Sequence, residues 1–136
     1  MSEVNKIKPI SEAVAAVWDG AHVFLSGFTI ARNAIAIAHE LIRQNKKDLT
    51  FSQCIGAMDV DLLVGAGAVK RYIYGGGSLD RFGPLCNINR AIEEGTIEVD
   101  EWSGLSMAMR FLGGSLGLPC IPIQSLFGSD ILKNLL

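Results

Sequence analysis

The sequence has no long apolar run, no extended basic segment and no leader-like beginning. Its unbroken apolar segments are far shorter than the roughly 20 residues that span a bilayer. Lysine and arginine form runs no longer than a pair, as at Lys46-Lys47, whereas a nucleic-acid-binding surface needs a clustered basic stripe. Residues 1–9 carry charges but lack the apolar segment of a signal peptide. We therefore expect a cytoplasmic protein that binds neither membranes nor nucleic acids.

Cysteine and histidine are also scarce. Cys54, Cys86 and Cys120 form no CxxC pair, and His22 and His39 lie far apart in the sequence. Metal sites are built from ligand sets with characteristic spacing, and none is present. The sequence therefore predicts no metal site and three free thiols, buried or partly buried.

What the chain does contain is a large apolar fraction. Of its 136 residues, 49% are hydrophobic and 19% are charged, and the mean hydropathy is +0.33. The length fits a single domain, 1–136. A well-filled core would account for this composition, and so would a large obligate interface, which resembles a core cut in half. Composition alone leaves both explanations open.

Short apolar runs alternate with segments of helical periodicity. The runs predict buried strands at 22–26, 49–55, 70–74, 96–99 and 119–123. Helices are predicted at 31–44 and 88–94 and after the candidate N-caps Ser11, Asp59 and Ser103. This order is typical of an α/β fold with an open, mostly parallel sheet and helices on both faces.

The last predicted helix and the end of the chain carry two further expectations. The helix after Ser103 is expected to end at Gly113-Gly114 and to bury an apolar face, formed by Leu105, Ala108, Met109 and Leu112. Residues 131–136 are mostly apolar and follow the turn at 128–130 directly. We therefore expect a domain that is truncated at its C-terminus or that takes its last strands from elsewhere.

Two glycine-containing segments follow predicted strands. The segment from Ser26 to Thr29 joins the first strand to a helix, where backbone N–H groups and the helix N-terminus favour an anion. Taken alone, it fits an ordinary strand-to-helix turn better. The run Gly75-Gly76-Gly77 precedes Ser78 and predicts a close backbone approach to a ligand or to another chain. A flexible loop with a helix cap at Ser78 is an equally good explanation.

Other motifs are negative. The segment 65–70, GAGAVK, precedes a strand instead of following one, which excludes a dinucleotide fingerprint. Asp59 and Asp61 stand at a helix start, where capping is the default role. Of the remaining carboxylates, Glu101 follows a strand and could border a cleft. No nucleophile is identified from the residues alone.

Three stretches together resemble the family I CoA-transferases. The segment 19–28, DGAHVFLSGF, is similar to the N-terminal signature of that family. Ser26, Arg32 and Ala34 depart from the signature, and these departures resemble the A chain of the glutaconate CoA-transferase branch. The segment 59–80, DVDLLVGAGAVKRYIYGGGSLD, and the IEVDEWS core of 91–103 resemble the same branch.

The resemblance implies an open α/β sheet of the CoA-transferase type and an A-type subunit that pairs with a B-type subunit. The substrates would be a coenzyme A thioester and a free (di)carboxylic acid, with no permanently bound cofactor. The nucleophilic glutamate would belong to the partner, so no catalytic nucleophile is expected here. Gly27 and Phe28 would support the oxyanion. The expected substrate-binding residues are Ser26, Arg32, Gly75, Gly76, Gly77 and Ser78, although Arg32 also fits a solvated helix residue.

Three other interpretations stay open. A hydrolase of CoA thioesters on the same fold would use a glutamate of this chain, for which only Glu101 is available. A non-catalytic module would use residues 75–78 as a nest for a small anion. A truncated remnant without function is the third, and only the apolar C-terminus supports it.

Overall fold

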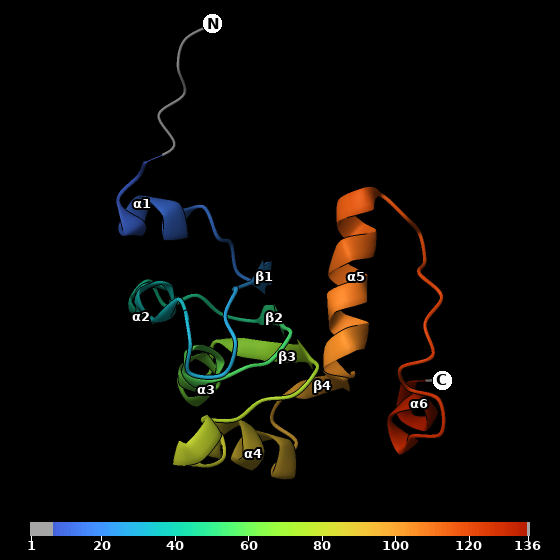
Figure 1. Ribbon diagram of the computed structural model, residues 1–136. Coiled ribbons are helices and arrows are strands. Elements are labelled where there is room, and N and C mark those ends of the chain that lie inside the picture. The colour runs from blue at the N-terminus through green and yellow to red at the C-terminus, as the bar shows by residue number, and fades with distance from the viewer. Residues whose placement is uncertain (1–6, 136) are drawn as a thin grey trace, which may run out of the picture.

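The computed structural model describes residues 7–135, and its centre is a sheet of four parallel strands (Figure 1). The strands lie in sequence order: β1 (His22–Phe24), β2 (Leu49–Gln53), β3 (Val69–Tyr74) and β4 (Glu98–Glu101). Each parallel connection requires a crossover, which the intervening helices supply. The sheet edge formed by the carboxyl ends of the strands is therefore lined by four strand-to-helix loops.

Helices cover both faces of this sheet, as predicted. Figure 1 shows four helices on one side: α1 (Ile10–Ala15), α2 (Ile35–Arg43), α3 (Met58–Gly65) and α4 (Cys86–Glu93). The long helix α5 (Gly104–Leu116) runs along the other side, where Phe111 lies 4.4 Å from Phe24 of β1 between ring centroids. A short 3-10 helix, η1 (Asp80–Phe82), precedes α4, and α6 (Asp130–Leu135) closes the described chain. The latter helix was not expected from the sequence.

The two faces of the sheet differ in character. Leu49, Phe51 and Tyr72 are fully buried against the layer of four helices. Alternate residues point the other way because side chains in a strand alternate between faces. On that second face His22 is hydrogen-bonded to Ser52 at 2.6 Å, and an ion pair of 2.6 Å joins β3 to β4. Helix α5 therefore covers a face that is partly polar.

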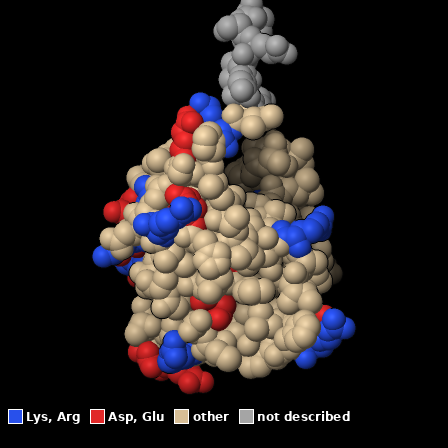
Figure 2. Space-filling model, turned by 90° about the vertical axis from the view of Figure 1, so that its left-hand side faces the viewer, with Lys and Arg blue, Asp and Glu red and all other residues tan. Residues whose placement is uncertain are grey.

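The outer surface of the four-helix layer carries charges of both signs. Figure 2 shows lysine and arginine interspersed with aspartate and glutamate around uncharged surface, without a broad patch of one sign. None of the helices in residues 7–135 is long and apolar enough to cross a membrane.

Two of the three predicted helix caps are wrong. Helix α1 begins after Pro9 and has no side-chain cap, so Ser11 lies inside it. Asp59 lies inside α3, fully buried, and accepts a hydrogen bond of 3.0 Å from the side-chain amide of Gln53. The prediction for Ser103 is confirmed, because its hydroxyl accepts a hydrogen bond from the N–H of Ser106.

Asp61 does cap a helix, but a different one from the helix that contains it. Its carboxylate accepts hydrogen bonds from the backbone N–H groups of Asn87 and Ile88, both at 3.0 Å, in the first turn of α4. A carboxylate also interacts favourably with the positive end of a helix dipole. The charge of Asp61 therefore fixes α4 against α3, a tertiary role that local sequence does not reveal.

The predictions near the C-terminus were the least accurate. Helix α5 continues through Gly113-Gly114 to Leu116, and its buried residues are Ser106, Met107 and Gly113. Leu105 and Leu112 of the expected inner face are instead 55% and 44% exposed. Residues 119–123 form no strand. The fourth strand lies two residues later than predicted, at Glu98–Glu101, and the predicted helix at 31–44 begins only at Ile35.

Candidate functional site

The carboxyl ends of β2 and β3 meet the start of α5 at unusually short range. A Cβ on Gly75 would lie 2.8 Å from the Cys54 carbonyl oxygen, 2.8 Å from the Cα of Gly104 and 2.9 Å from its nitrogen. All three atoms belong to the backbone and cannot turn away as a flexible side chain could. Only glycine therefore fits at position 75. We call this place, where the ends of β2 and β3 meet the start of α5, the glycine joint.

The glycine run extends the pairing of β2 with β3. The Gly75 N–H donates to the Cys54 carbonyl at 3.0 Å, and the Gly56 N–H donates to the Gly76 carbonyl at 2.9 Å. Gly77 forms a parallel bridge with Gly56, which also accepts from the Ser78 N–H at 3.2 Å. The close backbone approach expected for a ligand or a second chain is thus made with the chain's own backbone.

Ser78 follows this joint and is half-buried. Its hydroxyl oxygen accepts a hydrogen bond of 3.1 Å from the Asp80 N–H. The helix cap expected at Ser78 is not formed, because the N-cap of η1 is Leu79. The Ser78 hydroxyl proton is left to donate to another group, and a carboxylate oxygen is a suitable acceptor.

The loop after β1 contains a tight turn that engages one of the two expected oxyanion donors. Phe28 donates its N–H to the Ala31 carbonyl at 3.0 Å and accepts from the Ala31 N–H at 2.9 Å. The Phe28 N–H is therefore occupied in this conformation. Within residues 7–135, the N–H of Gly27 has no such partner. Of the two expected donors, Gly27 is the one that can still reach a ligand.

Asn33 holds this loop and was not recognised from the sequence. Its side-chain amide donates to the Thr29 carbonyl, and its Oδ1 is buried without a hydrogen-bond partner in the described chain. A Cβ on Gly27 would lie only 2.3 Å from that oxygen. Asparagine is common in turns because its side chain bonds to nearby backbone, which was the only available signal in the sequence.

Ser26 and Arg32 lie in the same loop, and both are exposed. Arg32 precedes α2 with a φ of 59°, so the alternative of a solvated helix residue is wrong in placing it in a helix, although the side chain is exposed to solvent. Neither side chain has a hydrogen bond or ion pair within the described range. The predicted site residues thus fall in two groups, at Ser26 to Arg32 after β1 and at residues 75–78 after β3, with the end of β2 between them.

A buried polar cluster lies beneath the joint. Asp59 and Gln53 are hydrogen-bonded to each other, and Tyr72 places its hydroxyl under Gly56, where a Cβ would lie 1.9 Å from it. Burial raises the pKa of Tyr72, and the Asp59 charge raises it further. Tyr74 stacks on Tyr72 with 4.6 Å between ring centroids, and burial followed by the Glu101 charge raises its pKa. Both tyrosine hydroxyls therefore stay protonated and uncharged.

Glu101 and Cys54 are the remaining groups at this edge that could attack a substrate. Glu101 ends β4 opposite Tyr74 and is exposed, and its carboxylate has no hydrogen bond or ion pair among residues 7–135. Cys54 directs its thiol towards the Gly104 carbonyl at 3.4 Å, and burial raises the pKa of that thiol. Because the thiolate is the nucleophilic form, Cys54 is a poor nucleophile. No cluster of three or more potential metal ligands occurs in the described residues.

The comparisons with known proteins agree with this architecture. The family model for coenzyme A transferase matches residues 7–134. The chain is 36% identical to the A chain of the 3-oxoadipate CoA-transferase of Pseudomonas knackmussii, over 85% of this chain and 42% of that protein. It is 29% identical to the IpdA chain of the cholesterol ring-cleaving hydrolase of Mycobacterium tuberculosis, over 93% of this chain and 44% of that protein.

A solved structure shows the same fold. The crystal structure of glutaconate coenzyme A-transferase from Acidaminococcus fermentans superimposes with a TM-score of 0.87 and 29% identity, covering 95% of this chain and 41% of that chain. The chain thus spans less than half the length of each of these three proteins. Sequence and fold agree across nearly all the described residues, and the chain belongs to the coenzyme A transferase family.

Proposed function

We propose that this chain is the A-type part of an acyl-CoA:carboxylate CoA-transferase, and that a B-type partner contributes the nucleophilic glutamate. The observation that carries the proposal is the composition of the sheet edge. It offers a free backbone donor at Gly27 and a hydroxyl donor at Ser78, whereas the Cys54 thiol is kept protonated and Ser78 has no basic partner within hydrogen-bond reach in the described chain. Apart from the exposed Glu101 carboxylate, such an edge can stabilise charge but lacks an activated nucleophile.

The proposed reaction proceeds in balanced steps. The partner's glutamate attacks the acyl-CoA carbonyl, and the C–S bond breaks to give an acyl-glutamyl anhydride and the CoA thiolate. The thiolate attacks the glutamyl carbonyl and releases the first acid, leaving a glutamyl-CoA thioester. A second carboxylate attacks that thioester, and the expelled thiolate then takes the new acyl group, which restores the glutamate. The glutamate intermediates make this covalent catalysis.

This chain contributes binding and charge stabilisation to each step. The Gly27 N–H donates to the oxyanion that forms at the attacked carbonyl. The Ser78 hydroxyl donates to the acyl or carboxylate oxygen. Arg32, whose guanidinium can hold a carboxylate in bidentate fashion, binds the far end of a dicarboxylic acid. The two transferases among the named relatives carry the names of two different dicarboxylic acids, 3-oxoadipate and glutaconate.

The test is to co-express the chain with a B-type CoA-transferase chain and to purify the complex. CoA transfer from acetyl-CoA to a series of mono- and dicarboxylic acids is then followed by chromatography of the thioesters. We expect transfer only when both chains are present. A complex that releases free CoA without forming a new thioester would contradict the transferase. Turnover by the chain alone would contradict the assignment of the nucleophile to the partner.

A second function, hydrolysis of a CoA thioester, is favoured by one observation. Glu101 is exposed at the sheet edge and has no partner within residues 7–135, as a nucleophile or general base would require. The relative that belongs to a ring-cleaving hydrolase makes this alternative concrete. It differs from the transferase in needing a carboxylate of this chain.

Replacing Glu101 with glutamine separates these two functions. If the partner supplies the nucleophile, we expect the transfer rate of the E101Q complex to stay within about tenfold of the unmodified complex, because the reacting carboxylate is unchanged. If Glu101 is the essential base, the rate should fall by about 10²–10⁴-fold. The matched control is Glu98→Gln, an exposed glutamate of the same strand that lies away from the edge. Equal losses in both variants would exclude a specific role for Glu101.

A further inference from the structure

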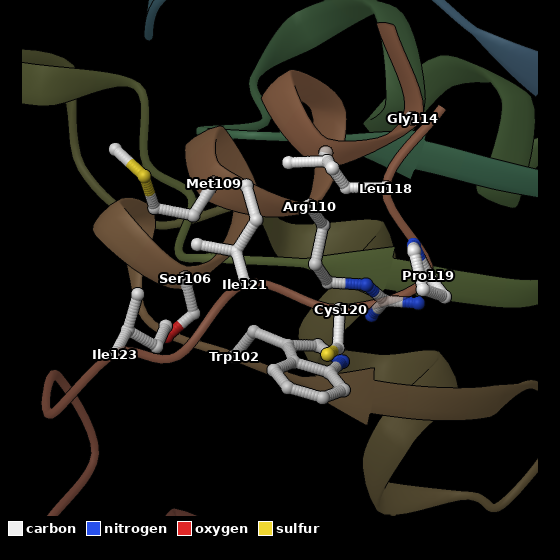
Figure 3. A pocket seen from close by; sticks show the side chains of 11 residues that line it. Trp102, Ser106, Met109, Arg110, Gly114, Leu118, Pro119, Cys120, Ile121 and Ile123 are labelled. Carbon is white, nitrogen blue, oxygen red and sulfur yellow. The ribbon is translucent and has the colours of Figure 1, made fainter. Parts of the chain in front are cut away.

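A pocket of about 360 Å³ lies between α5 and the segment that follows it (Figure 3). Helix α5 contributes Ser106, Met109 and Arg110 to its lining, and the segment after the helix contributes Leu118 and Ile121. This segment is the region predicted to be a strand, and in the structure it runs back along the helix. Its end is tied to the helix start by a hydrogen bond between the Ser125 and Ser103 hydroxyls. The pocket therefore has a fixed wall on each side.

Arg110 is the single charged residue of the pocket lining within the described chain. Its guanidinium lies over the Trp102 ring, 4.3 Å from the centroid. In residues 7–135 it has no carboxylate partner, whereas Arg71 and Arg43 are each paired with an acid. Stacking on an aromatic face fixes the plane of a guanidinium and leaves its N–H edge free for a planar anion. The pocket thus contains an oriented cation without a counterion.

The pocket also contains a donor without an acceptor. The indole Nε1–H of Trp102 is buried and has no hydrogen-bond partner within the described chain. Figure 3 shows the Arg110 guanidinium, the Cys120 side chain and the nitrogen-bearing edge of Trp102 on the same side of the pocket. Elsewhere the lining is mainly apolar, from Met109 to Ile121, with Ser106 as a further polar residue. A ligand that suits both parts is an anion with a short hydrocarbon chain.

We propose that this pocket binds a short-chain carboxylic acid, with its carboxylate on Arg110 and its hydrocarbon chain against the apolar wall. Pockets of a few hundred cubic ångströms, mostly apolar with few polar groups, suit small organic ligands. In the proposed function, this pocket would hold the free acid. That role rests on the proposed function, whereas binding of the acid to the pocket does not. Binding of the acid to this chain can be measured without CoA, a partner or turnover.

The experiment uses the 136-residue chain labelled with ¹⁵N-tryptophan, which has two indole signals, from Trp18 and Trp102. Trp18→Phe assigns them. Titration with butyrate should shift the Trp102 signal saturably and leave the exposed Trp18 signal in place. Butyramide has the same shape without the charge, and inorganic phosphate has charge without the apolar chain. Both are expected to bind at least about tenfold more weakly than butyrate.

Arg110→Gln should weaken butyrate binding by at least about tenfold, because it removes a charge-assisted hydrogen bond. The matched control is Arg81→Gln, which removes the other arginine that lies over an aromatic ring, 5.1 Å from the centroid of exposed Phe82. It should leave binding unchanged. The proposal is overturned if butyrate and butyramide bind the unmodified chain alike, if R81Q weakens binding as much as R110Q, or if Trp102 does not respond. If the unmodified chain binds butyrate as expected but its complex with the B-type chain shows no CoA transfer, only the proposed function is contradicted.

Discussion

Replacing Gly75 with alanine is expected to lower the free energy of unfolding by about 3 kcal/mol or more, the upper range for overpacking. The added Cβ would stand less than 3 Å from Cys54 and Gly104 backbone atoms. To make room, β2 or α5 must move away from β3, which breaks the hydrogen bond between Gly75 and Cys54. Urea denaturation followed by far-ultraviolet circular dichroism measures the loss.

Gly114→Ala is the matched control for this change. Gly114 lies within α5, and a Cβ at this position would have no described atom within 4 Å outside its own helix turn. Alanine there should raise the free energy of unfolding by up to about 1 kcal/mol, because glycine in a helix is unfavourable relative to alanine. Opposite signs for the two substitutions are expected. Equal stability of G75A and the unmodified chain would show that the joint can relax, contrary to the geometry.

The second large effect is expected from Gly27→Ala in the complex with the partner. The new methyl group would meet the Oδ1 of Asn33, 2.3 Å from the Cβ position, so the loop after β1 must shift. Loss of one oxyanion donor typically costs 10²–10³ in kcat, and we expect a fall of about 100-fold in CoA transfer. Steady-state kinetics should show the loss in kcat, with the complex still assembling on a sizing column.

A second substitution in this chain, Asn33→Ala, tests the cause of that loss in CoA transfer. In the double variant G27A/N33A the oxygen that meets the new methyl group is absent, so part of the transfer activity should return. The φ of 159° at Gly27 and the nearby Arg32 carbonyl still disfavour alanine there. Asn33→Ala alone removes the hydrogen bond to the Thr29 carbonyl and should lower activity less than G27A does. A double variant no better than G27A would show that the methyl group acts otherwise than through Asn33.

The parallel sheet could be predicted because its signal is local and repeated. Strands β1, β2 and β3 are short segments that contain apolar residues, and each is followed by glycine or by a turn. Strand β2 is almost fully buried although Thr50, Ser52 and Gln53 are polar. The site loops could be placed for the same reason, because they follow those strands. What the residues in the loops contact was not predictable, since Gly75 meets Gly104 across a separation that no local pattern encodes.

The errors near the C-terminus have identifiable physical causes. Pro119 and Pro122 lack a backbone N–H, and this argues against a buried strand at 119–123. Helix α5 has apolar residues around most of its circumference, so its periodicity did not select the buried side. Phe111 faces the sheet at Phe24, whereas Gly113 lies against Ile121 of the segment that follows the helix. Leu105 and Leu112 face outwards. Asp59 was mistaken for a cap because its partner, Gln53, belongs to the preceding strand.

The glycine joint and the two neighbouring loops divide the molecule into parts with different freedom to change in evolution. At Gly75 every larger residue collides with backbone, so the point where β2, β3 and α5 meet is fixed by geometry. The loop from Ser26 to Arg32 follows β1, and the other segment follows α5. Both carry exposed side chains. Under the proposed function, substitutions in these two segments would change which acid is bound, while the glycine joint keeps the strand ends and the helix start in place.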